Sequence, residues 1–252
     1  MAASIRRFMS NLLTHQLSTL GLRSGDVVMV HASFKSLGVS DPEEVVSGLL
    51  DAIGPQGILM MPALSYRQEP AEFHDNRFTP SCVGFLPEYF RTRPGTRRSL
   101  HPTHSVCAVG GDVAGILDSH FADRTPCGRN SPFNLLIERK GKILMLGCGL
   151  KPNTTMHAIE EHVEPPYLYG PEREYTLTDE SGKVFQKTYI THGFAGYIQR
   201  YDRVEGLLDK AHLRTGRVGN ALCHLIDAEP LCRRSVRKMQ ENPFFFVDAE
   251  VV

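Results

Sequence analysis

The stretch from residue 25 to residue 64 reads G-D-V-V-M-V-H-A-S-F-K-S-L-G-V-S-D-P-E-E-V-V-S-G-L-L-D-A-I-G-P-Q-G-I-L-M-M-P-A-L and predicts the fold class. Its two apolar runs, V-V-M-V and I-L-M-M, have the length and the unbroken hydrophobicity of buried strands. Between them, Ser40 or Asp41 can cap a helix, Pro42 suits its first turn, and Gly54 suits its end. Strand, helix and strand make a βαβ unit, so we expect an α/β fold with a mixed, largely parallel central sheet flanked by helices.

Further elements are predicted from the periodicity of the rest of the chain. The first is an N-terminal helix with Leu12, Leu13, Leu17 and Leu20 at helical spacing and Gly21 at its end. The others are a short helix at 86–93, buried strands at 105–110 and 142–149, an antiparallel hairpin insertion at 174–190, and a helix, a short extended piece and a helix over 202–241. The first 25 residues lack acidic side chains, as an organelle transit peptide does, but their helical spacing favours a first helix of the domain. The polar, aromatic segment 65–87 favours a binding loop. We expect a single domain, residues 1–252.

The composition is that of an ordinary globular protein, with 41% hydrophobic and 22% charged residues. Because Lys+Arg and Asp+Glu both number 28, the net charge is zero, which argues against a nucleic acid or a membrane surface as partner. No apolar run reaches the length of about 18 residues that a membrane helix needs. The six cysteines show no C-x-x-C spacing, which is typical of free thiols in a reducing compartment, so we expect a cytoplasmic protein.

The segment N-T-T-M-H-A-I-E-E-H (153–162) places two histidines and two glutamates after a buried strand. On a helix, His157, Glu160 and Glu161 fall on one face, whereas His162 is displaced from His157 by about 140°. Helical zinc ligands need a separation of three or four residues, so the second histidine misses this spacing by one position. The spacing argues against a zinc site within the helix. It leaves open a ligand set completed from elsewhere, an acid/base pair, and a solvated helix face.

An acid/base pair needs only His157 and a carboxylate one turn along the helix, which can orient the ring and raise its basicity. Asn153, Thr154 and Thr155 stand where the helix begins, and their side chains and free N–H groups suit an anion or an oxyanion. Open α/β sheets bind their ligands at this carboxyl end of the strands. A capped helix with solvent-facing His and Glu side chains is the structural alternative.

The loop after the first strand, H-A-S-F-K-S-L-G, offers His31, Ser33, Lys35 and Ser36. Hydroxyls, a cation and loop N–H groups suit a phosphate-bearing ligand. The segment H-P-T-H-S-V (101–106) adds two histidines at the mouth of a strand. The chain contains no G-x-x-x-x-G-K-[ST], G-x-G-x-x-G or G-x-S-x-G, so a triphosphate loop, a dinucleotide fingerprint and a serine hydrolase elbow are not supported.

Read together, these motifs resemble those of the aminoglycoside 3-N-acetyltransferase family. The resemblance covers most of the chain and is carried by G-D-V-V-M-V-H-A-S-F-K-S-L-G, G-P-Q-G-I-L-M-M-P-A, F-L-P-E-Y-F-R, R-S-L-H-P-T-H-S-V, G-R-N-S-P-F and N-T-T-M-H-A-I-E-E, in this order. It implies an enzyme that moves an acetyl group from acetyl-coenzyme A to a primary amine. It also implies an α/β fold distinct from the common small-acetyltransferase (GNAT) fold.

By position, the resemblance implies that His157 removes the proton of the attacking amine and that Glu160 is its partner or holds a cationic substrate. Thr154 or Thr155 would stabilise the oxyanion of the thioester. The implied contacts to coenzyme A are His31, Ser33, Lys35, Ser36, Ser105, Val106 and Thr154, and those to the substrate are Tyr66, Asp75, Glu160 and Glu161. Direct transfer is favoured because no cysteine lies in the motif, although Cys148 leaves a covalent route open.

An aminoglycoside carries several positive charges, so its pocket is expected to be acidic. Local acids occur in two segments of this neutral chain: Glu69, Glu72 and Asp75, and Glu160, Glu161 and Glu164. We predict a metal-independent N-acetyltransferase with acetyl-coenzyme A as co-substrate and the 3-amino group of an aminoglycoside as the leading acceptor.

Three alternatives stay open. They are an acyltransferase of the same family that acts on another amine, a family member that binds coenzyme A without turnover, and a metal-dependent hydrolase that uses His157 and Glu161 with His101 or His104. A homodimer is also left open.

Overall fold

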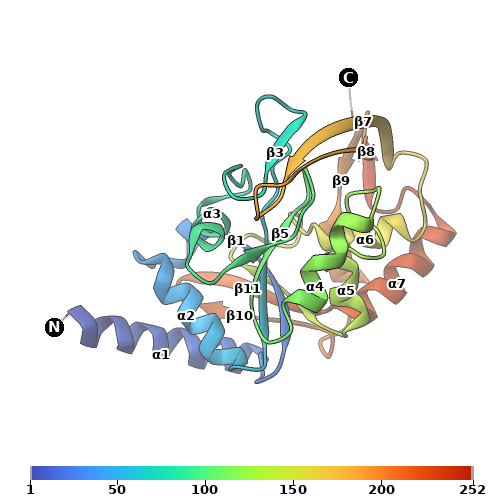
Figure 1. Cartoon of the computed structure of the whole chain (residues 1–252). Helices are drawn as coiled ribbons and strands as arrows, with labels where there is room; N and C mark the ends of the chain where they lie inside the picture. The colour runs from blue at the N-terminus through green and yellow to red at the C-terminus, as the bar shows by residue number, and fades with distance from the viewer. Residues whose placement is uncertain (1, 251–252) are drawn as a thin grey trace.

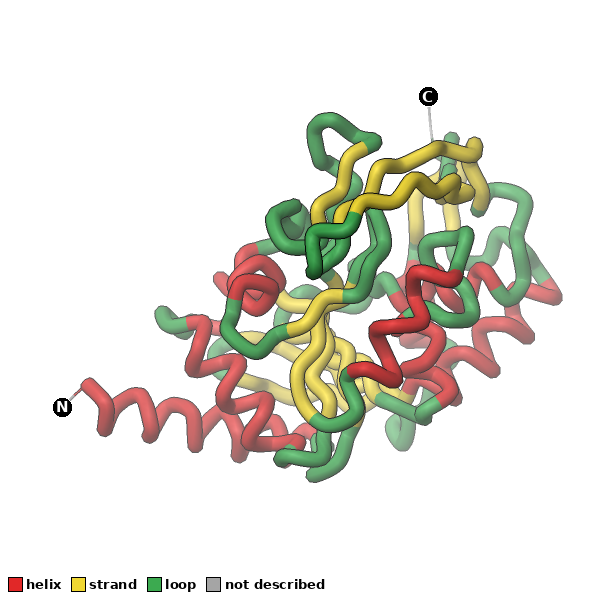
Figure 2. The backbone as a smooth tube through the Cα atoms, viewed as in Figure 1, coloured by secondary structure: helices red, strands yellow, loops and turns green. Residues whose placement is uncertain are grey.

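A seven-stranded sheet forms the centre of the structure, a computed structural model that describes residues 2–250 and the side chains of residues 11–250 (Figures 1 and 2). Its strands, in spatial order, are β10 (Leu213–Val218), β11 (Ala221–Asp227), β6 (Lys142–Leu146), β1 (Val27–Ala32), β2 (Ile58–Pro62), β5 (Val106–Gly110) and β4 (Arg97–Arg98). β6, β1 and β2 pair in parallel, and the other neighbouring pairs are antiparallel. By direction, β10, β6, β1, β2 and β4 run one way and β11 and β5 the other, so the predicted mixed, largely parallel sheet is confirmed.

The predicted βαβ unit is also confirmed, because α2 (Pro42–Ile53) joins the parallel strands β1 and β2. The carboxylate of Asp41 caps this helix by accepting a hydrogen bond from the N–H of Glu43 at 2.9 Å. Successive residues of β1, Met29 and Val30, are fully buried in two different apolar cores. Alternate side chains of a strand point to opposite faces, which explains why a strand covered on both faces shows no polar alternation.

Helices cover both faces of the sheet. One core is shared by α1 (Ala2–Leu20), α2 and α3 (Phe85–Thr92), and the other by α4 (Ala114–Leu117), α5 (Pro132–Glu138), α6 (Thr155–Glu161) and α7 (Ala228–Glu241). In Figure 1 the first group lies to the left of the strands and the second to the right. The architecture is therefore helix, sheet and helix in three layers.

The N-terminal helix, α1, forms as the leucine spacing predicts. Leu13, Leu17 and Leu20 are buried, whereas Leu12 is 40% exposed and lies off the apolar face. The helix ends at Gly21, whose φ of 127° is a backbone conformation that favours glycine. The predicted first helix is thus confirmed, with three of the four leucines on its buried face.

A second, three-stranded sheet lies over one end of the first, near the top of Figure 1. β7 (Tyr169–Thr178) and β8 (Val184–His192) form the predicted antiparallel hairpin, which is longer than expected at its open end. β3 (Phe73–Asp75), from the long polar segment 65–87, pairs in parallel with β7. This sheet brings the end of β8 close to the carboxyl ends of the central strands.

The prediction for residues 202–241 is correct at its two ends and wrong in its middle, where a hairpin of two strands takes the place of the short extended piece. The structure has a short 3-10 helix, η3 (Tyr201–Gly206), then the antiparallel hairpin of β10 and β11, and only then the predicted final helix, α7. The hairpin forms because β11 pairs with β6 and completes the sheet, a tertiary contact that local periodicity does not reveal. A further small sheet pairs β9 (Tyr197–Gln199) with β12 (Val247–Ala249).

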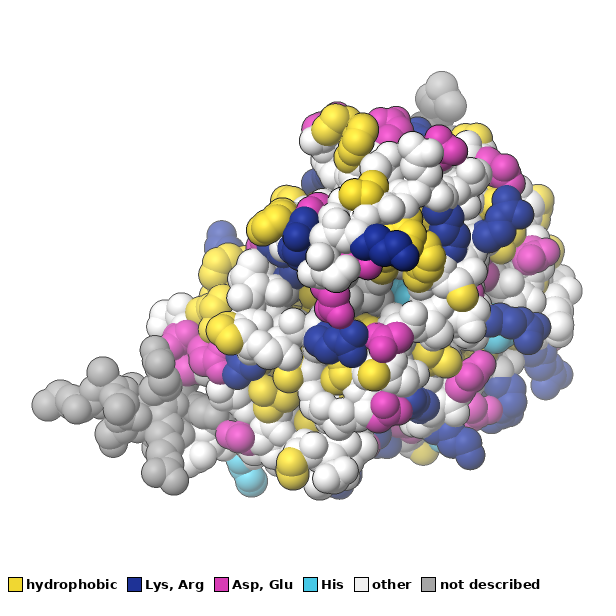
Figure 3. All heavy atoms as spheres, in the orientation of Figure 1, with side chains coloured by type: hydrophobic (Ala, Val, Ile, Leu, Met, Phe, Trp, Pro, Cys, Tyr) yellow, Lys and Arg dark blue, Asp and Glu magenta, His cyan; other side chains and the backbone are white. Residues whose placement is uncertain are grey.

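The predicted free thiols are confirmed: all six cysteines are unpaired, and Cys107, Cys127, Cys223 and Cys232 are buried. Between residues 2 and 250, no helix combines the length and the apolar character needed to cross a membrane. On the face in Figure 3, acidic and basic side chains are interspersed, as the balanced composition leads one to expect.

Replacing Leu144 by alanine is expected to lower the free energy of unfolding by about 2 to 5 kcal/mol, because a fully buried leucine on the central strand β6 leaves a cavity. The matched control is Leu222→Ala on β11, where the side chain is 53% exposed and the expected change is within about 0.5 kcal/mol. Denaturant unfolding measures both, and equal losses would contradict the assignment of the core.

Candidate active site

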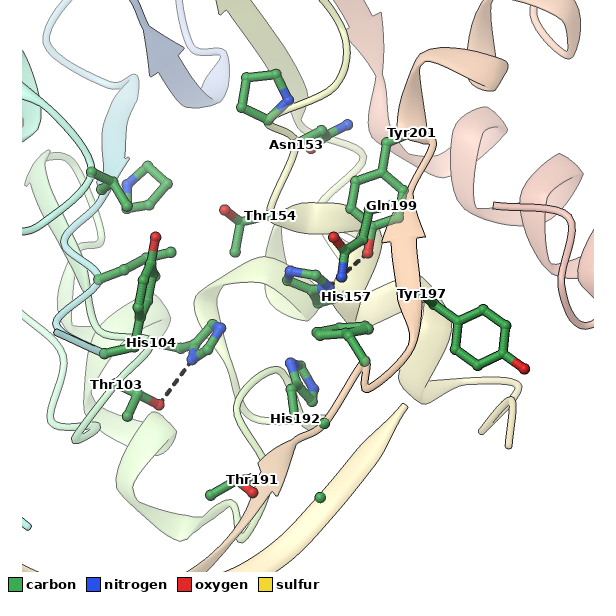
Figure 4. A pocket seen from close by; sticks show the side chains of 18 of the residues that line it. Thr103, His104, Asn153, Thr154, His157, Thr191, His192, Tyr197, Gln199 and Tyr201 are labelled. Carbon is green, nitrogen blue, oxygen red and sulfur yellow. Dashed lines mark hydrogen bonds between the residues drawn. The ribbon is translucent and has the colours of Figure 1, made fainter. Parts of the chain in front are cut away.

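A cavity of about 1280 Å³ opens where the carboxyl ends of the central strands face the second sheet. Its wall includes His31 near the end of β1, Cys148 just after β6, and Thr154 and His157 at the start of α6. His192, at the end of β8, joins the wall from the other side (Figure 4). The cavity therefore lies at the edge of the sheet where α/β proteins bind their ligands.

His157 and Glu160 are in direct contact on α6, as their shared helix face predicts. The imidazole Nδ1 lies 3.0 Å from Oε2 of Glu160 and 2.9 Å from the hydroxyl of Tyr201. Tyr201 also donates to Oε2 of Glu160 at 2.7 Å, and Tyr167 donates to Oε1 at 2.9 Å. Glu160 is fully buried, so its carboxylate is satisfied by these three side chains and fixes the orientation of the imidazole.

The two tyrosines of this cluster were not found from the sequence. Tyr201 lies on η3, 44 residues beyond His157, and Tyr167 lies in the loop before β7. Burial, together with the neighbouring Glu160 carboxylate, holds the pKa of Tyr201 well above its ordinary value, so the hydroxyl stays a donor. No local spacing could have signalled this contact, since it depends on how the C-terminal part of the chain folds back.

Glu161 and His162 do not share the environment of His157. The Glu161 carboxylate accepts hydrogen bonds from the hydroxyl of Thr125, the N–H of Cys127 and Nε2 of His192, and burial raises its pKa. It therefore lies behind His192. Nε2 of His162 lies 2.7 Å from the amide oxygen of Asn134, away from the cavity, as the predicted angular displacement requires.

Three histidines meet at the cavity wall: His104, His157 and His192, with ring centroids 5.1 to 6.0 Å apart. Burial lowers the pKa of His104 and of His192 well below the ordinary value, so both rings are neutral near pH 7. His101 is outside the wall, because its Nδ1 accepts the backbone N–H groups of Thr103 and His104. The hydrolase ligand set of His157, Glu161 and His101 or His104 is therefore not assembled around one point.

Of the two threonines predicted to meet the oxyanion, Thr154 lines the cavity and Thr155 does not. Thr155 is fully buried, and its N–H donates to the amide oxygen of Asn153 at 3.2 Å. Asn153 itself lines the cavity, and its Nδ2 is a buried donor without a partner among the described residues. Thr154 and Asn153 are thus the polar groups that α6 and its approach present to a ligand.

Of the predicted coenzyme residues near β1, His31 lines the cavity, whereas Ser33, Lys35 and Ser36 do not. Burial, together with the nearby His157, lowers the pKa of His31 to about 3. Lys35 is exposed on the following 3-10 helix, η1 (Phe34–Leu37), where Ser36 donates to the carbonyl oxygens of Ser33 and Gly147. The hydrogen bond to Gly147 ties the loop to the residue that follows β6.

Ser105 and Val106 are fully buried and do not line the cavity. The hydroxyl of Ser105 donates to the carbonyl oxygen of Ala63 and accepts from Nε of Arg98 at 2.8 Å. The structure therefore places these two residues in the packing between β5 and its neighbours.

The predicted substrate residues are also divided. Tyr66 lines the cavity and is 49% exposed, whereas Asp75 is outside the wall and pairs with Arg77 at 2.7 Å. None of the described residues that line the cavity carries a carboxylate, and the charged members of the wall are Lys151 and Arg173. The acidic pocket that the sequence analysis expected is not present in this wall.

Cys148 lines the cavity, but its surroundings do not favour a thiolate. Its Sγ donates to the carbonyl oxygen of His31 at 3.3 Å, and burial raises the pKa of the thiol to about 12. The thiolate is the nucleophilic form of cysteine, and it is scarce near neutral pH at such a pKa. The covalent route that the sequence left open therefore loses its nucleophile.

Known proteins resemble the chain over most of its length. The family model of aminoglycoside 3-N-acetyltransferase matches residues 29–240. An aminoglycoside N(3)-acetyltransferase III of Salmonella sp is 30% identical over 91% of each chain. Among solved structures, AAC-IIIb in binary complex with CoASH has a TM-score of 0.78 and 27% identity, with 92% of this chain and 96% of that chain covered. Sisomicin-bound AAC-VIa has a TM-score of 0.80 and 27% identity, with coverages of 92% and 97%.

Replacing Tyr201 by phenylalanine is expected to lower the free energy of unfolding by about 1 to 3 kcal/mol, because a buried carboxylate loses a donor. The matched control is Tyr197→Phe in the same wall, because the hydroxyl of Tyr197 has no hydrogen bond to the described residues. This variant is expected to change the free energy of unfolding by no more than about 0.5 kcal/mol. Urea unfolding measures both variants. A Tyr201→Phe loss no larger than that of the control would show that the phenol does not stabilise Glu160.

Proposed function

The chain belongs to the aminoglycoside 3-N-acetyltransferase family, and we propose from this that it transfers the acetyl group of acetyl-coenzyme A to a primary amine of an aminoglycoside, with the 3-amino group as the leading position. The observation that carries the proposal is His157 at the cavity wall, with its Nδ1 held by the buried Glu160 and its Nε2 free of hydrogen bonds to the described residues. Such a nitrogen is available to take a proton. The relatives whose structures hold coenzyme A and sisomicin support the two substrates.

In the proposed reaction His157 is the general base. The amine nitrogen attacks the thioester carbon while Nε2 of His157 takes the amine proton, and a tetrahedral intermediate forms. Its collapse breaks the carbon–sulfur bond, and the departing thiolate of coenzyme A takes the proton that His157 accepted from the amine, which returns the imidazole to its starting state. Glu160 is a positioning residue, since its complete burial supports the role of partner to the ring and does not support contact with a cationic substrate.

The oxyanion of the intermediate needs donors at the same wall. Thr154 is favoured over Thr155 because only Thr154 lines the cavity, and the unpartnered amide of Asn153 is a second donor beside it. Direct transfer in a ternary complex is favoured by the raised pKa of Cys148, which removes the obvious nucleophile of a covalent route.

For the substrates, we propose that coenzyme A lies along the loop from His31 to Lys35 and that Tyr66 contacts the acceptor amine. Glu161 acts through His192, to which it is hydrogen-bonded, and does not itself face the cavity. A cytoplasmic location is proposed because free thiols persist in a reducing compartment. The homodimer stays a prediction.

The deciding experiment measures acetylation of a panel of aminoglycosides by mass spectrometry, with acetyl-coenzyme A as donor. His157→Ala is expected to lower the rate by a factor on the order of 10² to 10⁴, because proton removal from the amine loses its base. Binding of coenzyme A, measured by calorimetry, is expected to remain.

The matched control for the base is His162→Ala on the same helix, because this side chain points to Asn134 and away from the cavity. It is expected to keep the wild-type rate. An aminoglycoside panel without product would overturn the choice of acceptor, and wild-type turnover by His157→Ala would remove the assigned base.

A second prediction concerns Lys35, which is exposed on η1 at the end of the loop that should meet the phosphates. Lys35→Gln is expected to weaken binding of coenzyme A by roughly three- to tenfold at low salt, with a smaller effect at high salt, because charge attraction is screened. Lys210→Gln, at another exposed lysine, is the control and should bind normally. An unchanged affinity for Lys35→Gln at low salt would exclude a phosphate contact here.

A further inference from the structure

The cavity wall brings together three imidazoles from three separate parts of the chain. His104 precedes β5, His157 lies on α6, and His192 ends β8 (Figure 4). One ring nitrogen of each lies within 4.8 Å of the corresponding nitrogens of the other two. Three histidines at such distances from one another are a common ligand set for a divalent transition metal.

The hydrogen bonds of the three rings leave one nitrogen of each without a partner among the described residues. Nδ1 of His104 lies 2.9 Å from the hydroxyl of Thr103, and Nδ1 of His157 contacts Glu160 and Tyr201. Nε2 of His192 lies 2.8 Å from Oε1 of Glu161. Nε2 of His104, Nε2 of His157 and Nδ1 of His192 therefore remain free.

The free nitrogen of His192 is the most informative of the three. Its side chain is only 4% exposed, and its Nδ1 is a buried polar atom without a partner. Burying a nitrogen that makes no hydrogen bond costs free energy, so a bound ligand that contacts this nitrogen would recover that cost. This observation is independent of the distances among the rings.

The partners behind the rings have the chemistry of a metal site. Metal-binding histidines commonly donate their second N–H to a carboxylate, which fixes the ring and raises its basicity. Here Glu160 contacts Nδ1 of His157 and Glu161 contacts Nε2 of His192, which leaves the other nitrogen of each ring for an ion. No carboxylate lines the wall in the described residues, so the donor set consists of imidazole nitrogens alone, which favours zinc, copper, nickel or cobalt over magnesium or calcium.

We propose that His104, His157 and His192 form a binding site for a divalent transition metal ion, and that an ion bound there blocks the nitrogen of His157 that takes the proton of the acceptor amine. The first half of the proposal is independent of the proposed function, and the second half rests on it. The ion is an inhibitor in this scheme and takes no part in the transfer.

Binding requires a small contraction of the site. Tetrahedral zinc with nitrogen ligands at 2.0 to 2.1 Å holds them about 3.4 Å apart. From separations of at most 4.8 Å, the longest pair would have to close by about 1.4 Å or less, which side-chain rotations at a cavity wall can supply. Three protein ligands leave a fourth position open to water.

The test titrates the full-length protein with Zn²⁺ by calorimetry, and with Co²⁺ by visible absorption, without coenzyme A. One ion per chain with the absorption of a low-coordinate cobalt site is expected. His104→Ala and His192→Ala should each weaken binding about tenfold or more, and Glu161→Gln should do so by about 10- to 100-fold because it holds a ligand. His15→Ala, at an exposed histidine of α1, should bind like the wild type.

Failure to bind one ion per chain overturns the proposal, and so does wild-type affinity in His192→Ala. If that variant does not fold, Cu²⁺ bound to the wild-type protein is analysed by electron paramagnetic resonance. Three coordinating nitrogens then support the site, and a single one overturns it.

The inhibition is tested separately, with the acetylated product followed by mass spectrometry because thiols bind zinc. Equimolar Zn²⁺ should lower the rate about tenfold or more, a chelator should restore it, and excess acceptor should relieve it. Unchanged turnover with the ion bound overturns the second half of the proposal. An ion bound to a protein that acetylates no amine supports the site and contradicts the proposed function, so the two failures are distinguishable.

Discussion

The hydrogen bonds of the buried Glu160 carboxylate determine how the residues around it are arranged. Burying a carboxyl group is costly unless its oxygens are hydrogen-bonded, and here His157, Tyr167 and Tyr201 are the partners of those oxygens. These partners come from α6, from the loop before β7 and from η3, so one carboxylate joins three separate segments around the cavity. Loss of Tyr167 would leave Oε1 without a partner among the described residues, and loss of Tyr201 would leave Oε2 with His157 alone. The stability of these segments is therefore linked to the orientation of the His157 ring.

This arrangement orders the imidazole in the absence of a ligand. With Nδ1 held by Glu160 and Tyr201, the ring of His157 has one nitrogen left for the cavity, and no reorganisation is needed before a proton is taken. His192 is oriented in the same way, because its Nε2 is hydrogen-bonded to the carboxylate of Glu161. Two adjacent glutamates of α6 therefore orient two different histidines, although only one of these histidines is on the helix.

The local features of the chain could be predicted from the sequence, and the contacts between distant segments could not. The contact of His157 with Glu160 follows from a three-residue spacing on a helix, and the unit of β1, α2 and β2 follows from apolar runs and caps. Tyr201 and His192 were missed because each reaches the site through tertiary folding. The same cause explains why the short extended piece predicted between two helices is in fact the hairpin of β10 and β11, since β11 pairs with the distant strand β6. It also explains the burial of Ser105, which precedes a central strand.

The wall chemistry bears on how an acceptor amine is recognised. An acidic pocket was predicted from the sequence, but Asp75 forms an ion pair with Arg77 outside the cavity. Glu160 and Glu161 are hydrogen-bonded to His157 and His192 and do not line the wall. The described wall instead presents aromatic rings, among them Tyr66, Phe194 and Tyr197. Ring faces attract cations more weakly than carboxylates in a solvated site and select by shape, so recognition here depends on the fit of the acceptor to the rings more than on its total charge. Under the proposed function, these rings would select which amine reaches His157, because family membership alone does not fix the acceptor.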